Sequence, residues 1–143
     1  YEIASKTKEK VLEKNWDISS SNFTHNENYR VTYINEDAKN TIEIYDVNAA
    51  KNIELPDFEN KSVTSVGFSR DESMMRLYVG GSNSPGNLFS YNLETKELIQ
   101  LTDVLNKEIN PDHLVNAKVI RYNSFDGVEI PAIYYLPHQA SAD

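Results

Sequence analysis

Histidine and cysteine most often carry catalysis or metal binding, and this sequence offers few of them. It contains three histidines and no cysteine, so a thiolate nucleophile, a thiolate metal site and a disulfide are excluded. His25, His113 and His138 lie 88 and 25 residues apart, without the His-x-x-x-His or Glu-x-x-His spacing that places two metal ligands on one element. We therefore predict no catalytic, cofactor-binding or metal-ligating residue, no cofactor, and histidines that are exposed or locally hydrogen-bonded.

The acidic balance limits the classes of partner. The chain has 143 residues, with 14 Lys and Arg against 22 Asp and Glu, and a net charge of −8. No excess of cations is left to neutralise phosphates, so we expect no nucleic-acid partner. No run reaches the roughly 18–20 apolar residues of a membrane span, so we expect no membrane partner either.

The N-terminus carries neither an initiator Met nor a signal peptide, since Tyr1–Ile3 leads into no apolar core. We expect the chain to have been cut from a longer protein. Its compartment stays open between cytoplasm and periplasm, because a cysteine-free sequence suits both.

The elements that would position any functional side chain recur along the sequence. Tyr45–Leu55 matches Tyr91–Leu101 at an offset of 46 residues without a gap, and a partial third copy begins at Tyr1. Two upstream matches are Val31–Ile34 with Leu77–Gly80, also at 46, and Ser21–Thr24 with Val66–Ser69, at 45. A period of 45–46 residues built from short strands is the blade length of a β-propeller.

These repeats predict an all-β fold, a partial β-propeller of about two and a half four-stranded antiparallel blades over residues 1–112, followed by a β-hairpin. Strands are expected at 18–23, 29–34, 41–47 and 52–55, and again at 65–69, 75–79, 88–93 and 98–101. Residues 80–86 predict a loop, because they carry Gly, Asn, Ser and Pro.

Repeat-equivalent aromatic residues are expected to pack within or between the sheets: Tyr45 with Tyr91, and Phe23 with Phe68. The charged residues Glu36, Asp37, Lys6, Lys8, Lys10 and Lys14 are expected on a solvated outer face.

The pattern changes after residue 112. Val115–Tyr122 and Val128–Pro137 are expected to be strands on either side of Asp126-Gly127, a strong hairpin signal because both turn residues tolerate positive φ. Pro131 cannot donate a backbone hydrogen bond, which favours an edge or bulged strand. Residues 138–143 are expected to form a loop or linker.

The segment Tyr122–Pro137 resembles the first hairpin of the catalytic domain in prolyl-oligopeptidase-family serine peptidases. In that family the last propeller blade leads into a pattern like S-x-D-G-x-x-I-x-x-x-x-x-x-P. The corresponding positions here are Ser124, Asp126, Gly127, Ile130 and Pro137. The resemblance implies that residues 113–143 are the junction and the first hairpin of a truncated α/β-hydrolase-type catalytic domain.

The same resemblance locates the chemistry elsewhere. The family's catalytic serine stands in a G-x-S-x-G elbow, followed by Asp and His. The nearest approach, Ser82–Gly86, lacks the first glycine, so the resemblance implies that the triad lies beyond Asp143 and that the chain alone is inactive. The parent would hydrolyse peptides through an acyl-serine intermediate, while the propeller restricts substrate access. Its partners would be a peptide substrate, the remaining blades and the catalytic domain.

Two alternatives stay open: a non-enzymatic propeller that acts as a binding module, and a propeller fused to an esterase-like hydrolase. The hairpin at Asp126-Gly127 favours a hydrolase, because a plain propeller does not need it. An incomplete ring leaves both lateral edges unpaired, so the isolated chain is expected to self-associate through them.

Overall fold

The computed structural model describes residues 1–37 and 39–140, which form two four-stranded antiparallel sheets and a two-stranded hairpin. Blade 1 consists of β1 (Asp17–Phe23), β2 (Tyr29–Glu36), β3 (Lys39–Asp46) and β4 (Lys51–Ile53). Blade 2 consists of β5 (Ser62–Phe68), β6 (Met74–Gly81), β7 (Ser84–Asn92) and β8 (Leu98–Gln100). In each blade every strand pairs with its neighbour along the chain, so the partial propeller of four-stranded antiparallel blades is confirmed.

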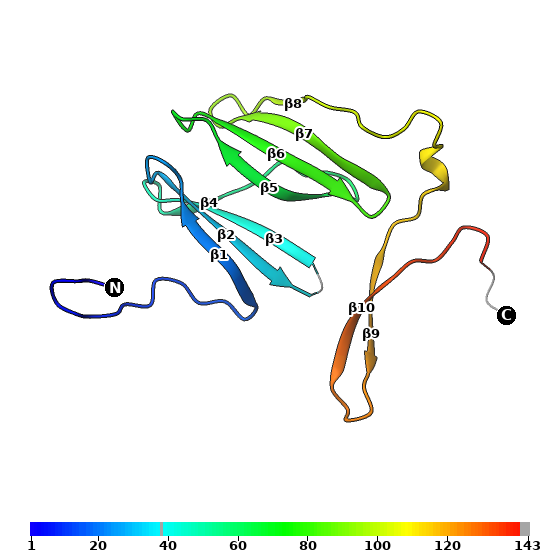
Figure 1. Ribbon diagram of the computed structural model, residues 1–143, viewed down its shortest axis with the longest axis horizontal. Coiled ribbons are helices and arrows are strands. Elements are labelled where there is room, and N and C mark those ends of the chain that lie inside the picture. Colours follow the sequence, from blue (N-terminus) through cyan, green and yellow to red (C-terminus); the bar gives the residue numbers. More distant parts are fainter. Residues whose placement is uncertain (38, 141–143) are drawn as a thin grey trace.

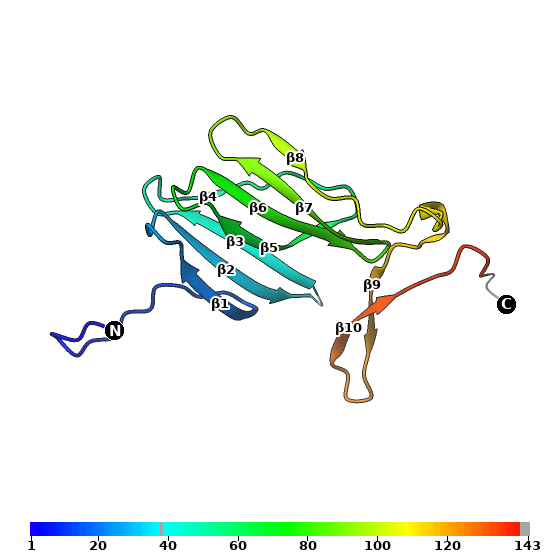
Figure 2. The same ribbon diagram turned by 45° about the horizontal axis from the view of Figure 1, so that its top comes forward.

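The blades lie face to face, and the hairpin projects from one end of the pair (Figures 1 and 2). A short 3-10 helix, η1 (Pro111–His113), precedes the hairpin of β9 (Lys118–Asn123) and β10 (Glu129–Tyr134). No helix among the described residues is long and apolar enough to cross a membrane.

The turn between the first two strands has the same geometry in both blades. The Thr24 hydroxyl accepts a hydrogen bond from the Tyr29 amide at 3.1 Å, and the Ser69 hydroxyl accepts one from the Met74 amide at 3.0 Å. Glu27 and Glu72 both adopt left-handed φ, 60° and 58°. The repeat therefore extends to individual hydrogen bonds, because a short hydroxyl side chain satisfies the turn locally.

The turn between the last two strands of a blade occurs three times. The Asn92 amide donates to the Glu97 carbonyl at 2.9 Å, and the Glu2 amide donates to the Thr7 carbonyl at 3.0 Å. The residue before the second strand is left-handed in all three copies, at Lys6, Ala50 and Lys96. The partial third copy therefore exists as a turn, held by the single β-bridge Glu2–Thr7 instead of paired strands. Charged Glu9 stands where the full blades have Ile53 and Ile99, so the third copy lacks the apolar, β-branched residue of this strand.

The register of β2 differs from the sequence alignment. Val31 pairs with Asn22 and Ile44, whereas Leu77 pairs with Val66 and Phe89. The counterpart of Leu77 is therefore Thr32, at an offset of 45, and the predicted match of Val31 with Leu77 is wrong by one residue. Such a slip matters because successive strand residues point to opposite faces.

The extra residue lies in β7, and the loop predicted at 80–86 is wrong. Val79 pairs with Asn87 and Gly81 with Ser84, so one β6 residue, Gly80, opposes two on β7. A Cβ on Gly80 would lie 3.0 Å from the Cα of Gly86, so the two backbones approach as only glycines allow. The glycines form a bulge that continues the hairpin to its tip.

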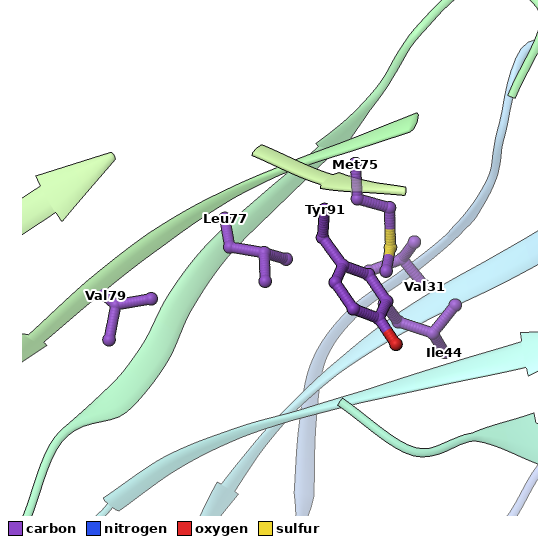
Figure 3. Close-up of a cluster of buried hydrophobic side chains, with 6 residues drawn as sticks. All are labelled: Val31, Ile44, Met75, Leu77, Val79 and Tyr91. Carbon is purple, nitrogen blue, oxygen red and sulfur yellow. The ribbon is translucent and has the colours of Figure 1, made fainter. Parts of the chain in front are cut away.

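The core is the contact between the two blades. Val31 and Ile44 of blade 1 face Met75, Leu77, Val79 and Tyr91 of blade 2 (Figure 3). We call the contacting surfaces the back face of blade 1 and the front face of blade 2; the front face of blade 1 is its opposite side. Burial of Tyr91, 5% exposed, and the stacking of Phe68 on Tyr29 at 5.0 Å confirm two of the aromatic packing predictions.

Phe23 does not pack as predicted, since it is 58% exposed. It pairs with Arg30, on the front face of blade 1, and among the described residues no sheet covers that face. Its repeat partner Phe68 is covered because blade 1 lies against it.

The hairpin is shorter than predicted and has a longer loop. Residues 124–128 connect β9 to β10, and only Gly127, at φ 83°, is left-handed. The Ser124 amide donates to the Val128 carbonyl at 2.8 Å and the Gly127 amide to the Ser124 carbonyl at 3.0 Å, so the loop closes through Ser124 instead of through a two-residue turn. Pro131 pairs with Arg121 in a sheet of two edge strands, where a missing amide hydrogen is tolerated.

We expect Leu77→Ala to lower the free energy of unfolding by about 3 kcal/mol, because Leu77 is fully buried between the blades and its truncation leaves a cavity. Urea denaturation followed by circular dichroism measures this loss. Leu101→Ala is the control, since Leu101 is 58% exposed and should cost about 0.5 kcal/mol or less. Equal losses for the two variants would contradict an inter-blade core centred on Leu77.

Candidate functional site

The histidines lie in three separate places. His25 is in the β1–β2 turn, His113 in η1 and His138 after β10, and all three are exposed. Within residues 1–37 and 39–140, no group of three or more His, Cys, Asp or Glu side chains could hold a metal ion. Ser82 stands at the β6–β7 tip and accepts a hydrogen bond from the Ala117 amide at 2.8 Å, so it links blade 2 to the segment before β9.

A buried carboxylate joins the two blades at their turns. Glu72 is only 3% exposed, and its Oε1 accepts a hydrogen bond from the backbone amide of Asn26 at 2.6 Å. The Asn26 side-chain amide donates in return to the Arg70 carbonyl at 2.9 Å. Glu72 thus reaches from the turn of blade 2 back to the equivalent turn of blade 1. We call this contact the turn clasp.

The clasp favours the ionised carboxylate. Burial of Glu72 by itself acts to raise its pKa, but the hydrogen bond from the Asn26 amide and the nearby polar groups of Thr24 and Asn28 outweigh it, so the pKa is lowered. A lowered pKa means that the charged form stabilises the fold at neutral pH. The stabilisation is lost as the pH falls through the pKa of the folded state.

A cleft of about 500 Å³ opens where the blades meet the hairpin. Its walls come from both blades, from the β4–β5 connection and from the segment around β9 and β10. Three lysines, Lys39, Lys61 and Lys118, line it with one acidic residue, Asp57. In a chain of net charge −8 this is a local excess of cations, which suits a carboxylate or another anionic group.

An ion pair ties the hairpin to blade 1. Arg121 on β9 contacts Asp37, next to the end of β2, and its second nitrogen lies 3.1 Å from Glu129 Oε1. Asp37, followed by Glu129, raises the pKa of the guanidinium. Asp37 was predicted to lie on a solvated face; it is partly exposed there, and the hairpin supplies it with a cation. Lys14, also predicted there, is half-buried against Glu43 at 2.6 Å.

The hairpin itself exposes many large apolar side chains. Phe125 is fully exposed, and five others are between 41% and 58% exposed: Ile120, Tyr122, Val128, Ile133 and Tyr134. A concentration of exposed apolar side chains on so small an element marks a surface that another structure covers.

Sequence reasoning missed the turn clasp and the Arg121–Asp37 pair. The clasp had a signal, because Glu27 and Glu72 occupy the same position of the repeat, one residue after Asn26 and Asp71. The ion pair had none, since it joins residues 84 apart from different elements.

No protein-family model and no curated protein sequence matches the chain. Solved structures do match it. The chain is similar to prolyl oligopeptidase B from Galerina marginata in its apo form, with a TM-score of 0.65 and 24% identity over 90% of this chain and 18% of that one.

Two further structures agree. A variant of the same Galerina marginata enzyme, bound to a 35mer hydrolysis and macrocyclization substrate, matches with a TM-score of 0.63 and 27% identity over 83% of this chain and 17% of that one. A prolyl endopeptidase matches with a TM-score of 0.61 and 17% identity over 91% of this chain and 18% of that one. The chain is therefore a prolyl-oligopeptidase-like segment that spans less than a fifth of these proteins.

We expect Glu72→Gln to make the free energy of unfolding less dependent on pH in the acidic range. The wild-type chain should lose about 1 kcal/mol of its free energy of unfolding through this group as the pH falls from above the usual glutamate pKa through the lowered pKa of the folded state, whereas the variant lacks that loss. Urea unfolding at a series of pH values measures the difference, which should be largest at neutral pH and vanish in acid. Glu94→Gln, at an exposed turn position, should follow the wild type throughout. A constant difference at every pH would show that the carboxylate charge is not what matters.

We expect Arg121→Ala to loosen the hairpin and leave the blades unchanged, because it removes the side chain that contacts Asp37. Amides of β9 and β10 should exchange with deuterium severalfold faster, and raising the ionic strength should have a similar effect on the wild type, since exposed ion pairs are screened by salt. Lys107→Ala is the control, because it breaks the exposed Lys107–Asp103 pair outside the hairpin. Unchanged exchange in the hairpin would mean that the ion pair does not hold it.

Proposed function

We propose that this chain is part of a serine peptidase of the prolyl oligopeptidase type, the part in which the last propeller blades meet the first hairpin of the catalytic domain. One observation carries the proposal: the chain, which folds into two consecutive blades and a following hairpin, is similar to a prolyl oligopeptidase at 27% identity over 83% of its length. The division into blades up to residue 112 and a catalytic-domain opening at 113–143 belongs to this proposal.

The reaction proposed for the whole protein is peptide hydrolysis. A serine outside this chain attacks the scissile carbonyl, the amine product leaves after protonation, and water then hydrolyses the acyl-serine. The chain itself contributes walls. The contact between the blades buries apolar side chains and holds the blades together, so a ring of such blades restricts the active site to peptides and excludes folded proteins.

The hairpin links the propeller, which restricts substrate access, to the catalytic domain. Its exposed apolar side chains are those expected of strands that pair with and pack into a further sheet, here the α/β-hydrolase sheet. Arg121 would hold that sheet's first strands against blade 1, and the cationic cleft would lie at the boundary between propeller and catalytic domain.

We expect a longer protein that contains this chain to cleave short peptides and to leave the same sequence intact within a folded protein. A serine-directed fluorophosphonate should abolish the cleavage, and the 143-residue chain alone should show none. Matched peptide and ester substrates assayed by chromatography separate the candidates. Turnover of esters alone would favour an esterase-like hydrolase, and no turnover of either would favour a binding module.

A further inference from the structure

The turn clasp uses only one of the two glutamates that the repeat provides. Glu72 of blade 2 reaches blade 1, while its counterpart Glu27 in blade 1 is exposed. The backbone holds both in the same way. The Glu27 amide donates to the Thr24 carbonyl and the Glu72 amide to the Ser69 carbonyl, both at 3.0 Å. The φ angles of the two glutamates differ by only two degrees, 60° and 58°. The side chain of Glu27 therefore starts from the same position relative to its blade.

The surroundings of Glu27 repeat those of Glu72. Beside Glu72, Phe68 of the preceding strand stacks on Tyr29 of the other blade at 5.0 Å. Beside Glu27, the equivalent Phe23 is 58% exposed and lacks an aromatic partner within the described residues. In blade 2, the Glu72 carboxylate and the Phe68 ring both contact blade 1. The equivalent Glu27 and Phe23 of blade 1 are both exposed.

The third copy of the β3–β4 turn indicates what would fill this place. Residues 1–7 repeat the outer turn of a blade, down to the left-handed residue before its last strand. The segment that follows reaches the front face of blade 1, where Lys14 contacts Glu43 at 2.6 Å. An outer turn thus projects beyond the end of blade 1, on the side away from blade 2 (Figure 2), without an inner strand pair in the described residues.

We propose that Glu27 and Phe23 dock the inner two strands of a further blade, whose outer turn is residues 1–7. The Glu27 carboxylate accepts a hydrogen bond from the backbone amide at the position equivalent to Asn26 in that blade, and Phe23 stacks on the residue equivalent to Tyr29. The inference rests on the proposed function in one respect, that the chain is part of a longer repeat protein.

The docked surface has a defined chemistry. Blade 2 presents Met75 and Phe89 to blade 1, whereas the equivalent positions on the front face of blade 1 are Arg30 and Glu43. Thr32, the counterpart of Leu77, is already buried, at 2% exposed, and is not part of the docked surface. Arg30 lies over the Tyr45 ring at 5.0 Å, and its Nε is buried without a hydrogen-bond partner. The incoming blade should therefore face Arg30 with a hydrogen-bond acceptor, and this interface is more polar than the one between blades 1 and 2.

The test compares the two glutamates in the longer protein by hydrogen–deuterium exchange. Glu72→Ala should speed exchange of the β1–β2 turn at Asn26 by about two- to tenfold, the effect of losing one hydrogen bond. Glu27→Ala should speed exchange of the corresponding turn in the preceding blade by a similar factor. Glu27→Gln keeps an acceptor oxygen and should restore part of the protection, and Glu94→Ala should change neither turn.

Two results would overturn the proposal. One is a Glu27→Ala protein whose preceding blade exchanges as in the wild type while Glu72→Ala still affects Asn26. The other is loss of self-association of the 143-residue chain by Glu27→Ala in sedimentation, with no effect in the longer protein, which would make a second copy the occupant. Because exchange is measured without substrate, either result is distinct from a failure to find peptidase activity.

Discussion

The contact between the two sheets is the interaction on which the rest of this structure depends. Leu77 is fully buried there, and Met75, Val79 and Ile44 are each about 1% exposed, while most other large apolar side chains remain in partial contact with water. Val31 and Ile44 of one sheet are buried in this core because the other sheet lies against them. The turn hydrogen bonds and the Glu72 carboxylate, which accepts from the Asn26 amide, then fix the position of one blade relative to its neighbour.

The strands could be predicted from the sequence because equivalent strands occur in both copies of the propeller repeat. Sequence reasoning could not find the register of β2, since Val31 and Thr32 both fit a strand and the inserted residue lies in a bulge where Gly80 of β6 approaches Gly86 of β7. It misplaced Phe23 because equivalence within a repeat does not say whether a neighbour is present on that side. Contacts between distant segments, such as Arg121 with Asp37, leave no pattern in the sequence at all.

The same distinction holds for the candidate site: local sequence patterns could be predicted, and contacts between distant segments could not. The absence of metal-ligand spacing was readable from the histidines, and so was the resemblance of the hairpin to the opening of a hydrolase domain. The cationic cleft was not, because Lys39, Lys61 and Lys118 come together only when both blades and the hairpin are in place. Structural matches to a prolyl oligopeptidase and a prolyl endopeptidase, over 90% and 91% of the chain, agree with the resemblance and cover 18% of each of those proteins.

The left-handed residue that ends each outer turn is lysine, alanine and lysine in the three copies, and never glycine. A turn that tolerates such different side chains is specified by its hydrogen bonds and not by its sequence. A blade can then be duplicated and its surface can diverge without loss of its shape. The front face of blade 2 is apolar, whereas the front face of blade 1 carries charged residues, and both are outcomes of that divergence. Because the two faces differ, each favours a different neighbouring blade, which fixes the order of the blades.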